Sequence, residues 1–271
     1  MPDLSRRYYA ALVLPFDENG KIDEAGYRDL IQYFLQERFR SVGGLVANPE
    51  AGEIYYLTRE EKRRVAEIGV REAAGKMPVF GGVFDLTTEG WVAAPTPQWG
   101  LGVPGDAARL ICRQVPNIIG WKMIYNYDGQ RKMWKILRSL ERHVSIMAAG
   151  GGLFHEFLAH DVLDGTVSGS WNYGLEPMLD HIAAWRENDI VKARRIWVEG
   201  GLRDLHEFIY SDYSRLHLRY KVAAWLRGLI PNMRPPMPVP KQEEIETTGR
   251  LLKAAHIPVA QSSRQFSGRS L

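Results

Sequence analysis

The sequence contains a single cysteine, Cys112, among its 271 residues, so it cannot form an internal disulfide. Such low cysteine use is typical of proteins in a reducing compartment and predicts a cytoplasmic location. The sequence also lacks any uninterrupted apolar stretch approaching 18 residues, and residues 1–7 are not followed by a clean apolar segment with a cleavage site. We therefore expect a soluble protein with no membrane partner.

The sequence has little net charge, because 35 Lys and Arg residues face 32 Asp and Glu residues. Most basic residues lie on segments with helical patterns, where they are mixed with acidic residues, and no basic stripe with interleaved aromatic residues is present. Nucleic acid is therefore not an expected partner. A hydrophobic content of 45% is ordinary for globular proteins, and the length suits one large domain or two small ones.

Strand and helix patterns alternate through the first part of the chain. Apolar, strand-like runs occupy residues 8–16, 42–47 and 79–83. Helical patterns follow the first two runs at about residues 24–38 and 58–74. Asp23 can cap the first helix, and Thr58 with Glu61 fits a capping box at the second. This alternation at about 35-residue spacing predicts parallel βα units.

The same alternation continues, and the end of the chain is helical only. Further strands are expected at residues 118–125, 144–149 and 166–171. Further helices are expected at residues 105–115, 129–140 and 154–160, from Glu176 onward, and at 190–209, 214–229 and 243–255. We predict a TIM-type (β/α) barrel over residues 1–187, a C-terminal helical region over residues 188–257, and a flexible tail over residues 258–271.

One lysine lies in the middle of an apolar strand. The segment from Asn117 to Tyr125 (NIIGWKMIY) is rich in β-branched and aromatic residues, which predicts a buried strand around Lys122. Burial lowers the pKa of a lysine, and a neutral amine in an apolar pocket can attack a ketone and form a Schiff base. The alternative is a lysine near a strand end that reaches water or pairs with a carboxylate.

Several motifs together resemble a known family. They comprise the opening strand ending in Pro15-Phe16, the segment 43–61, the lysine strand from Pro116 to Lys122, and the segment 164–172. On these motifs the chain resembles the dihydrodipicolinate synthase / N-acetylneuraminate lyase family of Schiff-base aldolases and lyases. The resemblance extends over most of residues 8–257, with one interval excepted.

The resemblance implies a site and a reaction. Lys122 would form an imine with pyruvate or a related 2-keto acid, and an aldehyde would be the second substrate. The substrate-binding residues would be Ala51, Gly52, Glu53, Gly169 and Asn172. Glu53 is alternatively a structural carboxylate that fixes its loop, and Asn172 a hydrogen-bonded turn residue. The resemblance implies no metal or organic cofactor, and it implies a homodimer or homotetramer.

The excepted interval is a shortening between residues 90 and 118. A barrel needs roughly 30 residues for each βα unit, so about two strands are missing near Gly90-Trp91. The family's proton-relay tyrosine on strand five has no match here. In addition, Glu50 and Ala51 stand where the family usually has two hydroxyl residues. A catalytically impaired or inactive member of the same fold is therefore an alternative hypothesis.

Other residues suggest roles that must be weighed. The glycines at 150–152 follow a strand and precede a helix, which is typical of phosphate sites in barrels but also of a tight turn. They support a third hypothesis, a non-Schiff-base barrel enzyme that binds a phosphorylated ligand. Tyr125 and Tyr127 are candidates for the general acid or base, with core packing as the alternative.

Two histidines near these glycines suggest a metal site at first sight. His155 and His160 are five residues apart, however, which does not match the four-residue spacing of a helical zinc pair. We interpret them as surface or cap residues and expect no metal. Lys221 and Arg234 match structural parts of the family pattern, and we assign them no catalytic role.

Overall fold

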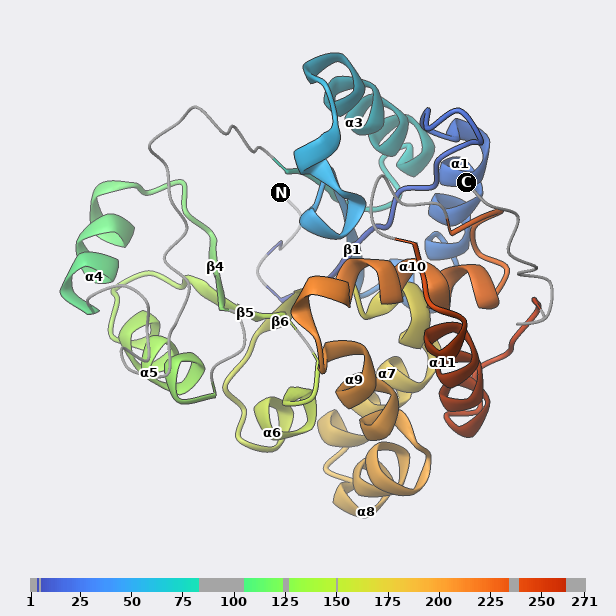
Figure 1. Cartoon of the computed structure of the whole chain (residues 1–271). Coiled ribbons are helices and arrows are strands. Elements are labelled where there is room, and N and C mark those ends of the chain that lie inside the picture. Colours follow the sequence, from blue (N-terminus) through green and yellow to red (C-terminus); the bar gives the residue numbers. More distant parts are fainter. Residues whose placement is uncertain are drawn as a thin grey trace. The chain divides into compact units, whose positions relative to one another are not determined.

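The computed structural model describes residues 4, 6–82, 105–123, 127–149, 151–233 and 239–261 (Figure 1). The chain divides into two compact units. The first unit comprises residues 1–9 and 84–168, and the second comprises residues 10–83 and 169–271. The predicted boundary between residues 187 and 188 stays a prediction.

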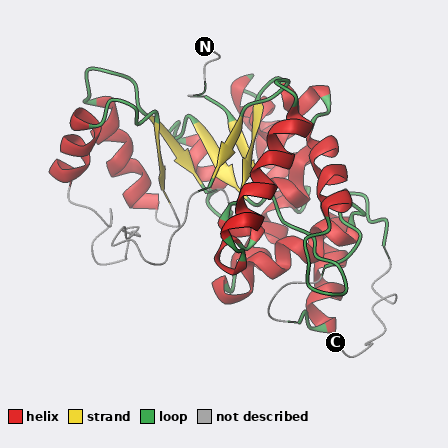
Figure 2. Ribbon diagram, turned by 90° about the horizontal axis from the view of Figure 1, so that it is seen from above, coloured by secondary structure: helices red, strands yellow, loops and turns green. Residues whose placement is uncertain are grey.

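The first unit is built on parallel strands that alternate with helices. Its strands are β4 (Gly120–Met123), β5 (Ser145–Ala148) and β6 (Gly165–Ser168), in the spatial order β6-β5-β4. The amide of Thr166 donates to the carbonyl of Arg7, so the start of the chain runs beside β6. The helices are α4 (Gly105–Gln114), α5 (Tyr127–Arg138) and α6 (Phe154–Ala159). The predicted parallel βα units are confirmed here (Figure 2).

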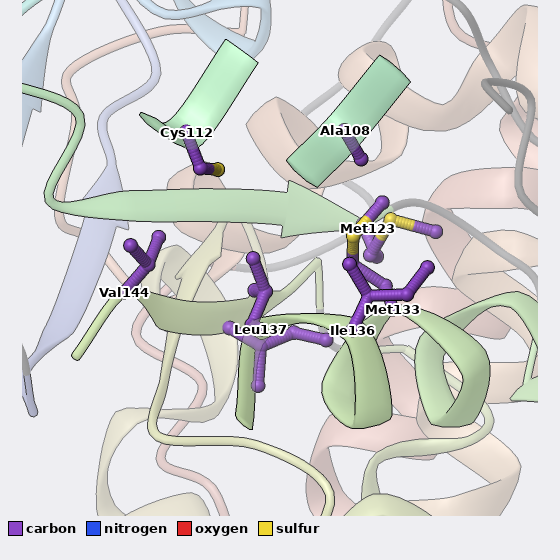
Figure 3. Close-up of a cluster of buried hydrophobic side chains, with 8 residues drawn as sticks. Ala108, Cys112, Met123, Met133, Ile136, Leu137 and Val144 are labelled. Carbon is purple, nitrogen blue, oxygen red and sulfur yellow. The ribbon is translucent and has the colours of Figure 1, made fainter. Parts of the chain in front are cut away.

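A hydrophobic core lies between α4, α5 and the strands of this unit (Figure 3). Met123 of β4 is buried in it, and Trp121 packs against it. Its other buried members are Ala108, Cys112, Met133, Ile136, Leu137, Val144 and Ile146. Because side chains alternate along a strand, packing Trp121 and Met123 into this core turns Lys122 toward the opposite face of β4.

The second unit contains the opening βα units. Strand β2 (Gly43–Ala47) pairs in parallel with β3 (Val79–Gly81), and the spatial order of the opening strands is β3-β2-β1. Strand β1 (Tyr8–Ala11) spans the point where the two units divide. The helices are α1 (Glu24–Phe34), α2 (Glu37–Arg40) and α3 (Arg59–Ala73).

Both predicted helix caps in this unit are confirmed. The carboxylate of Asp23 accepts a hydrogen bond from the amide of Gly26, and Thr58 with Glu61 forms a reciprocal capping box. The opening strand is shorter than predicted, because regular strand structure stops at Ala11 although the chain remains buried through Leu14. Burial and strand pairing are thus separate properties, and the apolar pattern reports only burial.

Helices make up the remainder of the second unit. They are α7 (Trp171–Arg186), α8 (Ile190–Arg194), α9 (Leu202–Tyr210), α10 (Leu216–Leu226) and α11 (Gln242–Ala254). Two predictions were wrong in this region. The single helix expected over residues 190–209 is broken, because Gly201 has a φ of +71° that ends the preceding π-helical turn (Arg195–Glu199).

The second wrong prediction concerns the segment 166–171 and the helix after it. Strand β6 ends at Ser168, and Trp171 already begins α7 instead of Glu176. The backbone of Gly174 is non-helical, so α7 consists of two helical pieces joined at a kink. Pro177 lies in the first turn after the kink, where its missing N–H costs no hydrogen bond.

Some predictions fall on residues that are not described. Residues 83–104 lie outside the described residues, and they include Gly90-Trp91 and the region expected to carry a strand-five tyrosine. Tyr125, Arg234 and residues 262–271 of the predicted tail also lie outside them. Within the described part of the chain, no helix is long and apolar enough to cross a membrane.

A buried aromatic cluster joins α7, α9 and the π-helical turn. The ring of His206 meets Tyr173 and Trp197 edge-on, with ring centroids 5.3 and 5.4 Å apart. The Nδ1 atom of His206 lies 3.3 Å from the Tyr173 hydroxyl, whereas its Nε2 atom has no hydrogen-bond partner among the described residues. Burial therefore lowers the pKa of His206 to about 3.

This burial predicts a pH-dependent stability. The ordinary pKa of a histidine is 6.5. As the pH falls below this value, His206 takes up a proton in the unfolded state but not in the folded state, so the unfolded state becomes more stable relative to the folded one. Between pH 7.5 and pH 5.5 we expect His206 alone to reduce the free energy of unfolding by about 1.4 kcal/mol. Urea unfolding at the two pH values measures it.

The matched variants are His206→Phe and His256→Asn, the latter at an exposed position. His206→Phe should reduce the loss of stability between the two pH values by about 1.4 kcal/mol, and His256→Asn should leave it unchanged. An equally steep loss of stability in His206→Phe would show that other groups are responsible.

Candidate active site

Lys122 is the penultimate residue of β4, next to the carboxyl end of that strand. It pairs in register with Met147 of β5. The expectation of a buried lysine was wrong, because Lys122 is exposed while Gly120 and Trp121 are only partly buried. The physical reason is the alternation described above, which gives the core to Trp121 and Met123.

A single arginine holds the chain that enters the lysine strand. Arg142 donates from Nη1 to the carbonyl of Ile118, over 2.6 Å. Its Nη2 donates to the carbonyls of Cys112 and Val115, over 2.7 and 3.1 Å. This fork joins the last turn of α4 to the segment leading into β4, so Arg142 positions Lys122 indirectly. The sequence analysis missed Arg142, because one arginine before a strand carries no distinguishing pattern.

The predicted carboxylate loop consists of two short 3₁₀ turns, Glu50–Gly52 and Ile54–Tyr56. A Cβ atom at Gly52 would lie 2.9 Å from the carbonyl oxygen of Leu12, so only glycine fits. The amide of Gly52 is already engaged, because it donates to the carbonyl of Pro49 over 3.0 Å. The amide of Ala51 makes no hydrogen bond within the described chain, which leaves it available to an acceptor.

Glu53 joins the two turns with a left-handed backbone, at a φ of +60°. Its side chain is buried and accepts a hydrogen bond from the ammonium of Lys221, which is 0% exposed. The same Nζ atom lies 4.5 Å from the ring centroid of Phe16. Burial raises the pKa of Glu53 and lowers that of Lys221 to about 8, and each charge opposes the shift of the other.

The geometry favours the structural interpretation of Glu53, because a left-handed non-glycine residue costs roughly 1–2 kcal/mol and needs such an anchor. From the sequence, Lys221 is expected to have only a structural role, and in the fold it anchors the loop through Glu53. A binding role for Glu53 stays a prediction.

Asn172 and Gly169 lie at the start of α7 and are both buried. The side-chain Nδ2 atom of Asn172 donates to the carbonyls of Ala11 and Gly169, and its Oδ1 atom accepts from the backbone amide of Val13. A Cβ atom at Gly169 would lie 2.3 Å from the ring of Tyr220, so close packing requires glycine here. Asn172 is thus a hydrogen-bonded anchor in this structure, and its predicted contact with substrate stays a prediction.

The structure brings one half of the predicted site together. The carbonyl of Leu12 lies against Gly52, and residues 11 and 13 form hydrogen bonds with Asn172. The loop and the start of α7 therefore pack against the same short segment of the second unit. Lys122 belongs to the first unit.

The glycine turn and Tyr127, which the sequence also offers as candidates, both make contacts typical of a structural role. Gly151 has a φ of +87°, and its carbonyl accepts from the amide of Phe154, as in a tight turn. Tyr127 stacks on Phe157 at 6.0 Å between ring centroids, which fits core packing. The described residues contain no group of three or more His, Cys, Asp or Glu side chains that could hold a metal ion.

Comparison with known proteins supports the family resemblance. Residues 4–92 match the model of the dihydrodipicolinate synthetase family. A 4-hydroxy-tetrahydrodipicolinate synthase from Protochlamydia amoebophila is 38% identical over 137 residues, which is 51% of this chain and 41% of that protein. An N-acetylneuraminate lyase from Fusobacterium nucleatum is 40% identical over 65 residues, which is 24% of this chain and 22% of that protein. The matched stretches thus span less than half the length of these curated relatives.

Solved structures show the same fold over nearly the whole chain. A dihydrodipicolinate synthase from Aquifex aeolicus gives a TM-score of 0.76 at 19% identity, covering 94% of this chain and 100% of that one. YagE, a prophage protein of the dihydrodipicolinic acid synthase family from E. coli K12 in complex with pyruvate, gives a TM-score of 0.77 at 17% identity, with 94% and 100% covered. The predicted fold class and the family resemblance are therefore confirmed.

Proposed function

We propose that this chain, with the fold of dihydrodipicolinate synthase, is a Schiff-base-forming lyase or aldolase that acts on pyruvate or a related 2-keto acid through Lys122. The observation that carries the proposal is the place of Lys122 beside the carboxyl end of a parallel strand. In barrels of this type, catalytic residues come from the carboxyl ends of the strands. Two further findings support it, namely the match to curated synthase and lyase relatives and the pyruvate named for a protein of the same fold.

The proposed reaction begins at the exposed amine. The unprotonated Nζ atom of Lys122 attacks the keto carbon, and loss of water from the resulting carbinolamine gives an iminium ion. Removal of a proton from the adjacent carbon then sends an electron pair to the nitrogen and forms an enamine. The enamine adds to an aldehyde, and water releases the product and restores the amine. Cleavage is the same sequence in reverse.

The loop supplies the proposed contact for the substrate carboxylate. The amide of Ala51 is an uncommitted donor in this loop, and Gly52 allows close approach of the backbone. Glu53 keeps the loop in place through Lys221 and does not itself contact the substrate in this proposal. The chemistry requires no metal or organic cofactor, because the iminium nitrogen is the electron sink.

The exposure of Lys122 also favours a second candidate, a catalytically impaired member of the same fold. A Schiff-base lysine benefits from surroundings that keep part of it unprotonated, and burial does not provide them here. The alternatives differ in one observable, which is whether Lys122 forms an imine at all.

Borohydride trapping with pyruvate decides between them. We expect mass spectrometry of the reduced, digested protein to show a pyruvate-sized adduct on the peptide that contains Lys122. The adduct should be absent from Lys122→Ala and present in Lys135→Ala, which removes an exposed lysine on α5. No adduct on folded protein would reject the proposed activity and support the impaired member.

The assembly and location proposed for the chain rest on the resemblance alone. We propose a homodimer or homotetramer in the cytoplasm, as the family pattern implies. Light scattering coupled to size-exclusion chromatography measures the assembly directly, and a monomer at micromolar concentration would contradict this proposal.

A further inference from the structure

A small polar cavity lies among the C-terminal helices of the second unit. Its volume is about 180 Å³, and it lies between the end of α9, the turn Tyr213–Arg215, α10 and the first turn of α11. Its lining includes Phe208, Asp212, Arg215, Arg219, Lys241 and Glu243. None of these residues takes part in the activity proposed above.

Two guanidinium groups in this cavity are held side by side by one carboxylate. The Nε atoms of Arg215 and Arg219 both donate to Oε1 of Glu244, over 2.9 and 3.3 Å. Although burial opposes it, hydrogen bonds from Arg215 and the amide of Lys241 lower the pKa of Glu244 to about 2. Glu244 therefore stays charged at any physiological pH, and its oxygens are occupied by the protein's own donors.

Each guanidinium keeps an uncommitted nitrogen. Arg219 donates from Nη1 to the carbonyl of Phe208 and to the hydroxyl of Ser211, and Arg215 donates from Nη2 to Glu244 and to the carbonyl of Val239. Within the described chain, Nη2 of Arg219 and Nη1 of Arg215 make no hydrogen bond. Arg219 is only 8% exposed, so its orientation is fixed by these contacts and not by solvent.

The cavity also offers uncommitted acceptors. Oδ1 of Asp212 accepts from the amide and the hydroxyl of Ser214, whereas its Oδ2 makes no hydrogen bond with the described residues. Glu243 is exposed, and its carboxylate likewise makes none with the described part of the chain. Residues with an uncommitted donor and residues with an uncommitted acceptor thus line the same small space. Such a lining matches a ligand that carries both charges better than it matches a simple anion.

We propose that this cavity binds a small zwitterion, the ammonium and carboxylate group of a free α-amino acid. The ligand carboxylate accepts one charge-assisted hydrogen bond from Nη1 of Arg215 and one from Nη2 of Arg219. The ligand ammonium donates to Asp212 and Glu243. Pockets for drug-sized ligands have volumes of roughly 300–1,000 Å³, so a cavity of this size selects a small side chain. A phosphate dianion would meet the carboxylates of Asp212 and Glu243 unfavourably.

Calorimetric titration of the full chain tests this proposal with L-alanine, acetate, methylamine and inorganic phosphate as separate probes. We expect saturable binding of L-alanine, at least about tenfold tighter than binding of acetate or methylamine, because each of these presents only one of the two charges. L-Tryptophan should bind more weakly than L-alanine, because its side chain exceeds the cavity.

Conservative variants connect the binding to the cavity. Asp212→Asn and Glu243→Gln should together weaken binding of L-alanine about tenfold or more, whereas binding of acetate should not weaken, because the two carboxylates repel an anion. Arg250→Gln is the matched control, because it removes an exposed charge farther along α11. All variants are first shown to unfold at the wild-type temperature. The proposal is overturned if L-alanine binds no tighter than acetate, if phosphate binds tighter than L-alanine, or if the paired variant binds L-alanine as well as Arg250→Gln does.

Discussion

Lys122→Ala is expected to reduce turnover of a 2-keto acid substrate by at least about a thousandfold, while the fold stays intact. The rate falls because the variant has no amine to form the imine, and loss of a covalent nucleophile typically has effects of this size or larger. The stability hardly changes because the side chain is exposed and lies outside the hydrophobic core, so we expect a difference within about 0.5 kcal/mol.

The measurement pairs steady-state kinetics with urea unfolding of the same preparations. A sensitive version follows hydrogen–deuterium exchange at the methyl group of pyruvate by NMR, which reports enamine formation without a second substrate. Lys135→Ala should retain wild-type exchange. Exchange at the wild-type rate in Lys122→Ala would assign the chemistry to another group.

Lys221→Met is expected to destabilise the protein by about 3–5 kcal/mol, a large part of a typical free energy of unfolding. The substitution leaves the buried carboxylate of Glu53 without its partner, at a position where water cannot replace the ammonium. Glu53→Gln alone removes the negative charge beside the buried ammonium of Lys221. The free energy of unfolding, measured by guanidinium chloride denaturation, gives both effects.

The double variant Lys221→Met/Glu53→Gln separates pairing from packing. We expect it to be more stable than the sum of the single changes predicts, by about 1–3 kcal/mol, because it removes both charges together. Arg38→Ala provides the comparison at the surface. It breaks the ion pair with Asp180, in which both side chains are about half exposed, and it should cost less than about 1 kcal/mol. The buried pair does not anchor the loop if Lys221→Met and Glu53→Gln each cost less than about 1 kcal/mol and their effects on the free energy of unfolding simply add.

The loop at residues 50–53 shows which properties of a site can be predicted from the local sequence and which cannot. The presence of Glu50 and Ala51 before Gly52-Glu53, where the resemblance leads one to expect two hydroxyl residues, is visible in the sequence. The sequence does not show that the amide of Gly52 is already used by Pro49, because that bond depends on the 3₁₀ turn. The structure therefore shows that the amide of Gly52 is engaged, whereas that of Ala51 makes no hydrogen bond with the described residues.

Features that arise from neighbouring residues could be predicted from the amino-acid sequence. The alternation of strands and helices, the cap at Asp23 and the capping box at Thr58 follow from spacings of a few residues, and the structure confirms them. The resemblance to one family also followed from short motifs, and the comparisons confirm it.

The surroundings of the candidate functional side chains depend on the three-dimensional packing and could not be predicted. Glu53 and Lys221 are 168 residues apart, and nothing in either segment shows that they pair. The exposure of Lys122 was misjudged for a related reason, since an apolar strand has two faces and the packing of Trp121 and Met123 decides which one is covered. Pairing and burial depend on how distant segments pack in three dimensions, whereas caps and periodicity depend on neighbours along the chain.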